Sequence, residues 1–410
     1  LVAGACSAAA GCPPAAPQAT LTRHTTASAD HRMAPSMAPG VHTSDWFVPG
    51  REWHARPMEQ QEVIGFDPAV IERWLPTVTD VAGPLTWTRL PGGHSNLTYQ
   101  LTDANGRQLV IRRPPLGELL PKAHDMWREY RIIRGLWPTA VPVAEPIAYC
   151  DDRAIAEAHF YVMGKSGGRA LYTANETSKW LTDPTPEAAR QHAGERFIDT
   201  LAALHSLEPA DVGLDELGRP DQYVARQLKT WYSGWQAASP VAKHDDPRAH
   251  ELHDALVQAI PEQGPGRVVH GDFGPHNSLF SATGELQAVL DWELSTLGDP
   301  LADLAYTINA WVEPGDDGVY GADPATTLPG FPSRADLIER YSAATGRDIT
   351  ESLGYYRGFN YFKSAAILLG VYARYVAGQK SSEGVDLEGL FARITDGIDA
   401  AWEFTTDLRR

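Results

Sequence analysis

The sequence has few cysteines, no long apolar run and no excess of basic residues. Only three of its 410 residues are cysteine, and two of these, Cys6 and Cys12, lie near the first residue. A disulfide-stabilised scaffold is therefore excluded, and a reducing, cytoplasmic compartment is expected. No run of about 18 apolar residues is present, so we expect no transmembrane helix and no membrane partner. The net charge of -17 argues against a nucleic-acid partner, which would need a basic face.

Residues 1–45 differ from the rest because they are rich in Ala, Pro, Ser and Thr and lack periodic apolar spacing. This composition predicts a disordered N-terminal tail. Two alternatives stay open. The segment Leu1–Cys6 has some likeness to a lipoprotein cleavage box, although a basic region and a long apolar core are missing. The second alternative is that translation begins at Met33 or Met37. The mass of the native N-terminus would decide among the disordered tail, the lipoprotein anchor and the later start.

The next part, residues 46–163, is predicted to be a β-rich N-lobe. Runs of β-prone residues, one of them entered through the Asn105-Gly106 turn, predict five strands. These strands are expected at residues 85–90, 97–101, 108–112, 146–150 and 159–163. Asp67-Pro68 is typical of a helix N-cap followed by a first-turn proline, and a second helix is expected over residues 123–136.

Residues 164–410 are predicted to form a mainly helical C-lobe. A helix should begin at Thr185-Pro186 and run to about residue 205, because its apolar residues recur at helical spacing. Another helix should follow Arg219-Pro220. Further helices are expected near residues 248–259, 300–311, 334–344, 352–378 and 388–405.

The segment from His270 to Asn277 carries the strongest functional signal. It reads H-G-D-F-G-P-H-N, which places Asn277 five residues after Asp272, and the Asp291 of a D-W-E motif follows fourteen residues later. Phosphoryl transfer from ATP needs one carboxylate to orient a hydroxyl and two oxygen ligands for Mg²⁺. Protein kinases carry H-R-D-x-x-x-x-N followed by D-F-G. The spacing is therefore that of a kinase, while two identities differ.

A predicted hairpin explains how Asn277 and Asp291 could hold one metal ion. Strands at residues 278–280 and 286–290 flank a turn in which Gly284 can adopt positive φ. The hairpin would return Asp291 to Asn277, and both side chains offer the hard oxygen atoms that Mg²⁺ requires. The alternative is that Asp272 and Asn277 are turn formers and Asp291 caps the next element. The joint spacing favours Asp272 as the hydroxyl-orienting carboxylate. A β-rich first lobe joined to a helical second lobe that contains this set predicts an α+β, bilobal, protein-kinase-like fold.

Other residues around this segment are predicted to be structural. His270 is expected to form hydrogen bonds that hold the loop, and His276 to lie on the loop surface or near the phosphates. Asp299 precedes Pro300, which is typical of an N-cap before the first turn of a helix. Asp303 is also interpreted as structural.

The β-rich lobe offers candidate nucleotide-binding residues. A short glycine-containing loop, in which Gly93, Ser95 and Asn96 lie, could bring backbone N–H groups to phosphate oxygens; an ordinary hairpin turn is the alternative. The third strand ends in Arg112, at the place of the lysine in the kinase Val-Ala-Ile-Lys strand. Arg113 should point to the opposite face of that strand.

Two further nucleotide-side predictions depend on position alone. Glu129, on the helix after the third strand, is expected to pair with Arg112, with a solvated or intrahelical pair as the alternative. The segment that contains Tyr161 and Met163 is expected to be the hinge whose backbone meets adenine. A β-edge followed by a linker is the alternative.

Three motifs carry a resemblance to a known family. His270-Gly271-Asp272 with Asn277, the D-W-E motif at 291–293 and the G-D-P-L-A-D-L-A run at 298–305 resemble the aminoglycoside phosphotransferase and choline kinase-like superfamily. The segment 112–124, with the following 128–130, is similar to the kinase domain fused to some acyl-CoA dehydrogenases. The likeness covers roughly residues 60–400, and the C-terminal motifs are specific to the superfamily.

This resemblance implies ATP- and Mg²⁺-dependent transfer of the γ-phosphate to a small-molecule hydroxyl. Asp272 would orient the hydroxyl, Asn277 and Asp291 would hold Mg²⁺, and Arg112 would steady the phosphates. The acceptor could be an aminoglycoside-like cation, another sugar or alcohol, or a hydroxyacyl-CoA thioester. The alternative is a non-catalytic nucleotide-binding pseudokinase or scaffold. Two departures from the kinase pattern motivate it, namely Arg112 in place of lysine and the short glycine loop.

Overall fold

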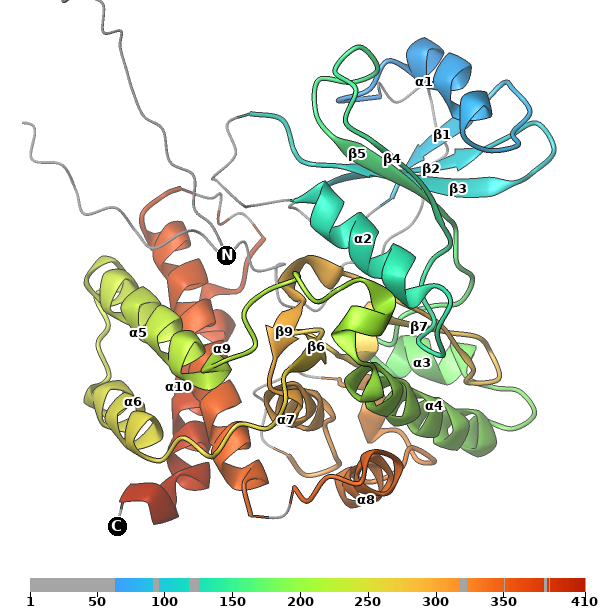
Figure 1. The fold of residues 1–410 in the computed structure, drawn as a ribbon. Coiled ribbons are helices and arrows are strands. Elements are labelled where there is room, and N and C mark those ends of the chain that lie inside the picture. Colours follow the sequence, from blue (N-terminus) through green and yellow to red (C-terminus); the bar gives the residue numbers. More distant parts are fainter. Residues whose placement is uncertain are drawn as a thin grey trace, which may run out of the picture. The chain divides into compact units, whose positions relative to one another are not determined.

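The computed structural model describes residues 63–90, 96–117, 125–316, 323–349, 351–379, 382 and 384–409. These residues belong to one compact unit of the chain, shown in Figure 1. The predicted tail at residues 1–45 and two predicted phosphate-loop residues, Gly93 and Ser95, lie outside the described residues.

The N-lobe is built on an antiparallel five-stranded sheet with the order β1-β2-β3-β5-β4. Its strands are β1 (Thr86–Arg89), β2 (Leu97–Thr102), β3 (Gln108–Arg113), β4 (Pro146–Cys150) and β5 (Phe160–Gly164). Burial alternates along β2, as expected of a strand with one face in a core, and Leu97, Tyr99 and Leu101 point inward. Helix α1 (Pro68–Trp74) packs Ile71 into the same core after the predicted Asp67 N-cap.

Helix α2 (Met126–Leu136) connects the sheet to the C-lobe. Figure 1 shows it lying between the sheet and the helices of the second lobe. The Asp125 side chain accepts the backbone N–H of Arg128 and caps the helix. The guanidinium of Arg128 donates to the carbonyl oxygens of Leu217 at 2.8 Å and Ser295 at 3.1 Å, so the helix is fixed against the segment that contains the catalytic motifs.

The C-lobe is mainly helical. Its helices are α3 (Ala174–Trp180), α4 (Pro186–Ser206), α5 (Tyr223–Ala242), α6 (Pro247–Gln258), α7 (Pro300–Ala310), α8 (Arg334–Thr345), α9 (Leu353–Val376) and α10 (Leu387–Phe404). Helix α9 packs against α5, α7 and α10, and α4 packs against α8 (Figure 1). Within the described residues, none of the helices has both the length and the apolar character that a membrane span requires.

Two small sheets shape the centre of the C-lobe. Strand β6 (Arg267–Val269) pairs with β9 (Thr296–Gly298), and β7 (Ser278–Phe280) pairs with β8 (Leu286–Val289). The β7–β8 pair is the predicted hairpin, with Gly284 at φ +86°. Figure 1 places these strands beside α7 and α4. The α+β prediction is therefore confirmed, with a β-rich first part and a helical second part.

One strand and one α-helix were not predicted, and both depend on tertiary contacts. Strand β9 has three residues and ends in glycine, so its extended conformation comes from pairing with β6. Helix α3 has no apolar periodicity. It begins where the Thr173 hydroxyl accepts the backbone N–H of Glu176, and it buries Ala174 and Thr177.

A pair of glycine substitutions tests the packing of the hairpin. Gly284 and Gly106 have nearly the same φ, +86° and +84°. A Cβ at Gly284 would meet the Ala189 carbonyl and lie 2.8 Å from the Ala193 nitrogen, whereas a Cβ at Gly106 would meet nothing within 4 Å. We expect Gly106→Ala to cost about 1 kcal/mol for left-handed backbone alone. Gly284→Ala should cost roughly 3 kcal/mol, because overpacking adds to that strain.

Urea unfolding of both variants measures this difference. Equal losses would show that α4 does not pack on the hairpin as described.

Candidate active site

The loop that carries Asp272 runs from β6 to η3, the short 3-10 helix Pro275–Asn277, and a buried carboxylate from α7 holds it. Asp303 accepts the backbone N–H of His270 at 2.7 Å and of Gly271 at 2.8 Å, and His205 Nε2 lies 3.2 Å from the same carboxylate. Burial opposes ionisation of Asp303, but His205 and these hydrogen bonds outweigh it and lower its pKa. Gly271 has φ +85°, a left-handed conformation that glycine adopts without strain.

His270 is a structural residue, as predicted. Its Nε2 donates to the carbonyl of Leu290 at 2.8 Å, and its Nδ1 accepts the backbone N–H of Asp272 at 3.2 Å. The two ring nitrogens thus connect the end of β8 with the backbone of Asp272. His270 is fully buried, so it positions the backbone of Asp272 and does not face a substrate.

Asp272 is surrounded by three hydrogen-bond donors. Its Oδ1 accepts the Tyr306 hydroxyl at 2.5 Å and lies 3.3 Å from His276 Nε2. Its Oδ2 accepts Asn277 Nδ2 at 3.0 Å. Burial raises the pKa of Asp272, but the attraction and hydrogen bonds of His276 and Tyr306 outweigh burial and lower it. Asp272 is therefore a carboxylate at neutral pH with a fixed orientation, as an acceptor for a substrate hydroxyl requires.

The structure brings the two predicted metal ligands to the open end of the β7–β8 hairpin, one on each strand's side. The Leu290 N–H donates to the Asn277 carbonyl at 2.8 Å, so Asp291 begins beside Asn277. Asn277 Nδ2 also donates to the Asp272 carbonyl at 3.1 Å, which leaves the amide Oδ1 as the free acceptor of that side chain among the described residues. Asp291 has φ +62° and accepts Arg112 Nη2 through Oδ1 at 3.3 Å.

Asn277 and Asp291 suit Mg²⁺ chemically, because each offers a hard oxygen atom. In the described part of the chain, no three His, Cys, Asp or Glu residues form a group that could hold a metal ion. Mg²⁺ usually keeps waters and binds substrate phosphates with only one or two protein ligands. Two oxygen ligands fit that pattern.

Arg112, on strand β3 of the N-lobe, contacts Asp291 in the C-lobe. Its Nε lies 3.1 Å from Glu129 Oε2, which also accepts the Tyr161 hydroxyl at 2.9 Å. Burial disfavours the charged form of Arg112, but Glu129 and Asp291 outweigh it and raise its pKa. Glu129 is buried, so the predicted pair with Arg112 is present and the solvated alternative is wrong.

The remaining predicted nucleotide-side residues lie in or near the sheet. Tyr161 and Met163 belong to β5, which is paired with both β3 and β4 over these residues. Asn96 is buried directly before β2. Arg113 points away from Arg112, donating to the Gly65 carbonyl with its guanidinium 5.6 Å from the centre of the Phe66 ring. The contacts of Asn96, Tyr161 and Met163 with a nucleotide stay predictions.

Sequence reasoning missed two residues of the site. Tyr306 lies one turn after Asp303 on α7, and nothing in its local sequence distinguishes it from a core tyrosine. Glu293 is the last residue of the D-W-E motif, and burial together with Asp291 raises the pKa of Glu293 to about 8. The sequence pattern assigns a role only to Asp291 of this motif.

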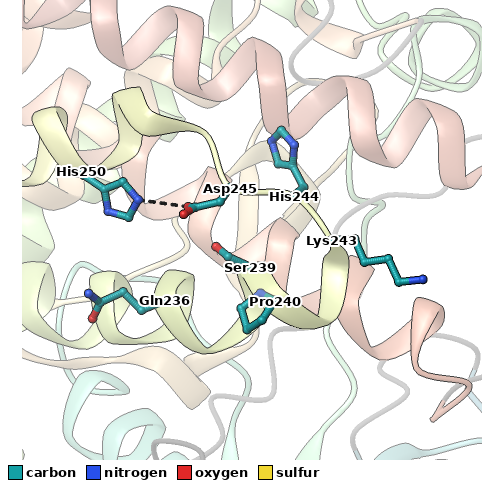
Figure 2. Close-up of a pocket in the computed structure, with 7 residues that line it drawn as sticks. All are labelled: Gln236, Ser239, Pro240, Lys243, His244, Asp245 and His250. Carbon is teal, nitrogen blue, oxygen red and sulfur yellow. Dashed lines mark hydrogen bonds and ion pairs between the residues drawn. The ribbon is translucent and has the colours of Figure 1, made fainter.

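A separate pocket of about 500 Å³ lies in the helical lobe, and none of the candidate catalytic residues lines it. Figure 2 shows its lining side chains, which come from the end of α5, the following turn and α6. Among these side chains, Asp245 Oδ1 and His250 Nε2 are hydrogen-bonded at 3.1 Å. This pocket is therefore not part of the candidate active site.

A β-rich lobe joined to a helical lobe, with an Asp-Asn-Asp set around one loop, defines a kinase-like phosphotransferase fold. The chain belongs to the phosphotransferase enzyme family (APH), whose model matches residues 86–337, more than half of the chain. The predicted family and the bilobal kinase-like fold are thus confirmed.

Curated relatives support the predicted subgroup. Acyl-CoA dehydrogenase family member 11 of Gallus gallus is 36% identical over 329 residues, covering 78% of this chain and 41% of the relative. Family member 10 of Mus musculus is 33% identical over 360 residues, covering 86% of this chain and 32% of the relative. The chain therefore spans about two fifths or less of the length of these proteins.

Solved structures show the same fold. A predicted aminoglycoside phosphotransferase from Ralstonia eutropha superposes with a TM-score of 0.70 at 29% identity, covering 83% of this chain and 99% of that one. An aminoglycoside phosphotransferase solved in a ternary complex with ADP and hygromycin B has a TM-score of 0.50 at 16% identity, covering 81% and 98% of the two chains. The second likeness concerns the fold alone.

Removing the anchor of the catalytic loop should destabilise the protein. We expect Asp303→Asn to cost about 3 kcal/mol, because an amide cannot replace a buried carboxylate that accepts two N–H groups and faces His205. The folded-state pKa of Asp303 is depressed, so its contribution is fully present above the unfolded-state pKa. It should decrease as the pH falls through the folded-state pKa. Chemical denaturation at several pH values measures this.

The control is Asp336→Asn at the exposed capping box of α8, where Asp336 accepts the Ser333 N–H. The Asp336→Asn variant should lose much less free energy of unfolding than Asp303→Asn. Equal losses at the two positions would contradict the anchoring role of Asp303.

Proposed function

We propose that this protein transfers the γ-phosphate of ATP, bound with Mg²⁺, to a hydroxyl of a small molecule. The observation that carries the proposal is that Asp272, Asn277 and Asp291 lie close together in the C-lobe, with Arg112 reaching Asp291 from the other lobe. This set contains the hydroxyl-orienting carboxylate, the two metal ligands and the phosphate-side cation that such a transfer needs.

In the proposed reaction, the acceptor oxygen bonds to the γ-phosphorus while the bond from that phosphorus to the β–γ bridging oxygen breaks. ADP leaves, and the hydroxyl proton passes to Asp272. Tyr306, His276 and Asn277 fix the Asp272 carboxylate, so its remaining lone pair can orient the hydroxyl. Bound Mg²⁺ would supply charge neutralisation at the phosphates. Asn277 and Asp291 would hold it.

The nucleotide would bind between the lobes in this proposal. Arg112 would face the phosphates while Glu129 fixes its orientation. Gly93, Ser95 and Asn96 would contact the phosphates, and the segment of Tyr161 and Met163 would meet adenine near the proposed lobe boundary at residues 163–164. The ADP complex of a protein with this fold supports ATP as the donor.

The acceptor that we propose to test first is a hydroxyacyl-CoA thioester. Its support is that the curated relatives are acyl-CoA dehydrogenase family members. We propose a reducing, cytoplasmic location, which the buried free thiol of Cys150 suits.

The first test replaces the proposed hydroxyl-orienting residue. Asp272→Ala should keep Mg-ATP binding and lower transfer by at least about 100-fold, because general-base catalysis typically contributes that much or more. ATP consumption is followed with a hydroxyacyl-CoA, an aminoglycoside and a sugar alcohol as acceptors. Asp254→Ala, at an exposed position on α6, is the matched control and should leave the rate unchanged. Wild-type turnover by Asp272→Ala would remove Asp272 from the mechanism.

The second test concerns the metal ligands. Millimolar Mg-ATP should raise the Tm of the wild-type protein, because a ligand that binds only the folded state stabilises it. Asp291→Asn should reduce this shift to the value seen with ATP and EDTA, because the variant loses the charged oxygen that would bind Mg²⁺. The wild-type protein with ATP and EDTA is the control. A wild-type protein with no shift at all would count against nucleotide binding.

A further inference from the structure

A buried lysine lies beneath the catalytic loop, and the proposed reaction does not yet use it. Lys363, on α9, is 6% exposed. Its Nζ donates to the carbonyl of Gly271 at 3.3 Å and lies 5.6 Å from the centre of the Tyr306 ring, over the ring. Both neighbours belong to the machinery of Asp272, because Gly271 precedes it and the Tyr306 hydroxyl donates to its carboxylate.

The surroundings of Lys363 do not compensate a buried charge fully. An ammonium group has three donors, and within the described residues Lys363 has one hydrogen bond and no ion pair. Burial lowers its pKa, although the attraction of Asp272 and Asp303 opposes this. A methionine of similar length would avoid the desolvation cost. A buried amino group that stability does not require is a candidate for a functional role, and its contacts with Gly271 and Tyr306 point to Asp272.

We propose that Lys363 is a positioning residue for phosphoryl transfer, acting on Asp272 through Gly271 and Tyr306. The ammonium holds the Gly271 carbonyl and so the left-handed turn that presents Asp272. It also attracts electron density from the face of the Tyr306 ring, which makes the phenol a stronger donor to Asp272 Oδ1. This inference rests on the proposed function.

The role predicts an effect on turnover that is separate from nucleotide binding. No hydrogen bond or ion pair among the described residues joins Lys363 to Arg112, Asn277 or Asp291. Loss of its charge should therefore disturb the hydroxyl-orienting side and leave the phosphate side unchanged.

The experiment uses the full chain and water as the acceptor, so that no substrate has to be known. Release of inorganic phosphate from Mg-ATP gives kcat, and equilibrium titration with Mg-ADP gives Kd. We expect Lys363→Met to lower kcat about tenfold or more while Kd changes by less than about twofold, as for an interaction made only in the transition state. Leu369→Val, at a fully buried position on the same helix, is the packing control and should lower Tm with kcat unchanged.

Rescue separates the charge from the volume of the side chain. Lys363→Ala should regain phosphate release several-fold with methylammonium and not with methanol at the same concentration, because only the former restores the cation. Equal rates with the two additives would overturn the inference. So would a Lys363→Met kcat within about twofold of wild type, or equal losses in kcat and Mg-ADP affinity.

The two proposals fail in distinguishable ways. The wild-type protein could bind Mg-ADP and yet transfer no phosphate to water or to any acceptor of the panel. That result would overturn the proposed function and with it the role of Lys363. A wild-type protein that turns over while Lys363→Met is unaffected would overturn the role of Lys363 alone.

Discussion

The contact of Arg112 with two carboxylates from different parts of the chain is the constraint on which the site depends. Its Nε faces Glu129 on α2 and its Nη2 faces Asp291 in the C-lobe. A planar guanidinium can serve two acceptors in different directions at once, whereas a lysine offers one point charge. The arginine therefore fits this strand, even though protein kinases carry lysine there. Loss of either acid would leave a largely buried cation with one charged partner instead of two. Breaking a buried ion pair by removing one partner typically costs about 3–5 kcal/mol, and the remaining acid would reduce that cost here.

The surroundings of Asp272 are also organised by buried polar groups. Asp303 holds the backbone of the loop, His270 connects that loop to the end of β8, and Tyr306 and Asn277 hold Asp272 itself. Each of these groups has hydrogen-bond partners that fix it, as buried polar groups require. These contacts orient the Asp272 carboxylate in the folded protein, so little further entropy is lost in orienting it when a ligand binds. Lys363 extends this network to α9.

Much of the fold and part of the site could be predicted because they depend on local signals. The helices at Asp67-Pro68 and Asp299-Pro300 follow from capping residues next to proline, and the β7–β8 hairpin follows from two β-prone runs around Gly284. The Asp272–Asn277 spacing spans five residues and the hairpin returns the chain to Asp291. Strand β9 and helix α3 escaped prediction because neither has a periodic pattern of its own.

The sequence by itself determined the kind of fold, the family and the Asp-Asn-Asp set. Strand and helix patterns predict the two lobes, the motifs within 270–305 indicate the family, and a predicted hairpin is enough to return Asp291 to Asn277. Only the tertiary structure decided which other groups complete the site. Tyr306 is 34 residues from Asp272, and Lys363 is 92 residues from Gly271. Contacts at such separations arise from the packing of α7 and α9 around the loop. A buried tyrosine and lysine on those helices have no local pattern that distinguishes them from core residues.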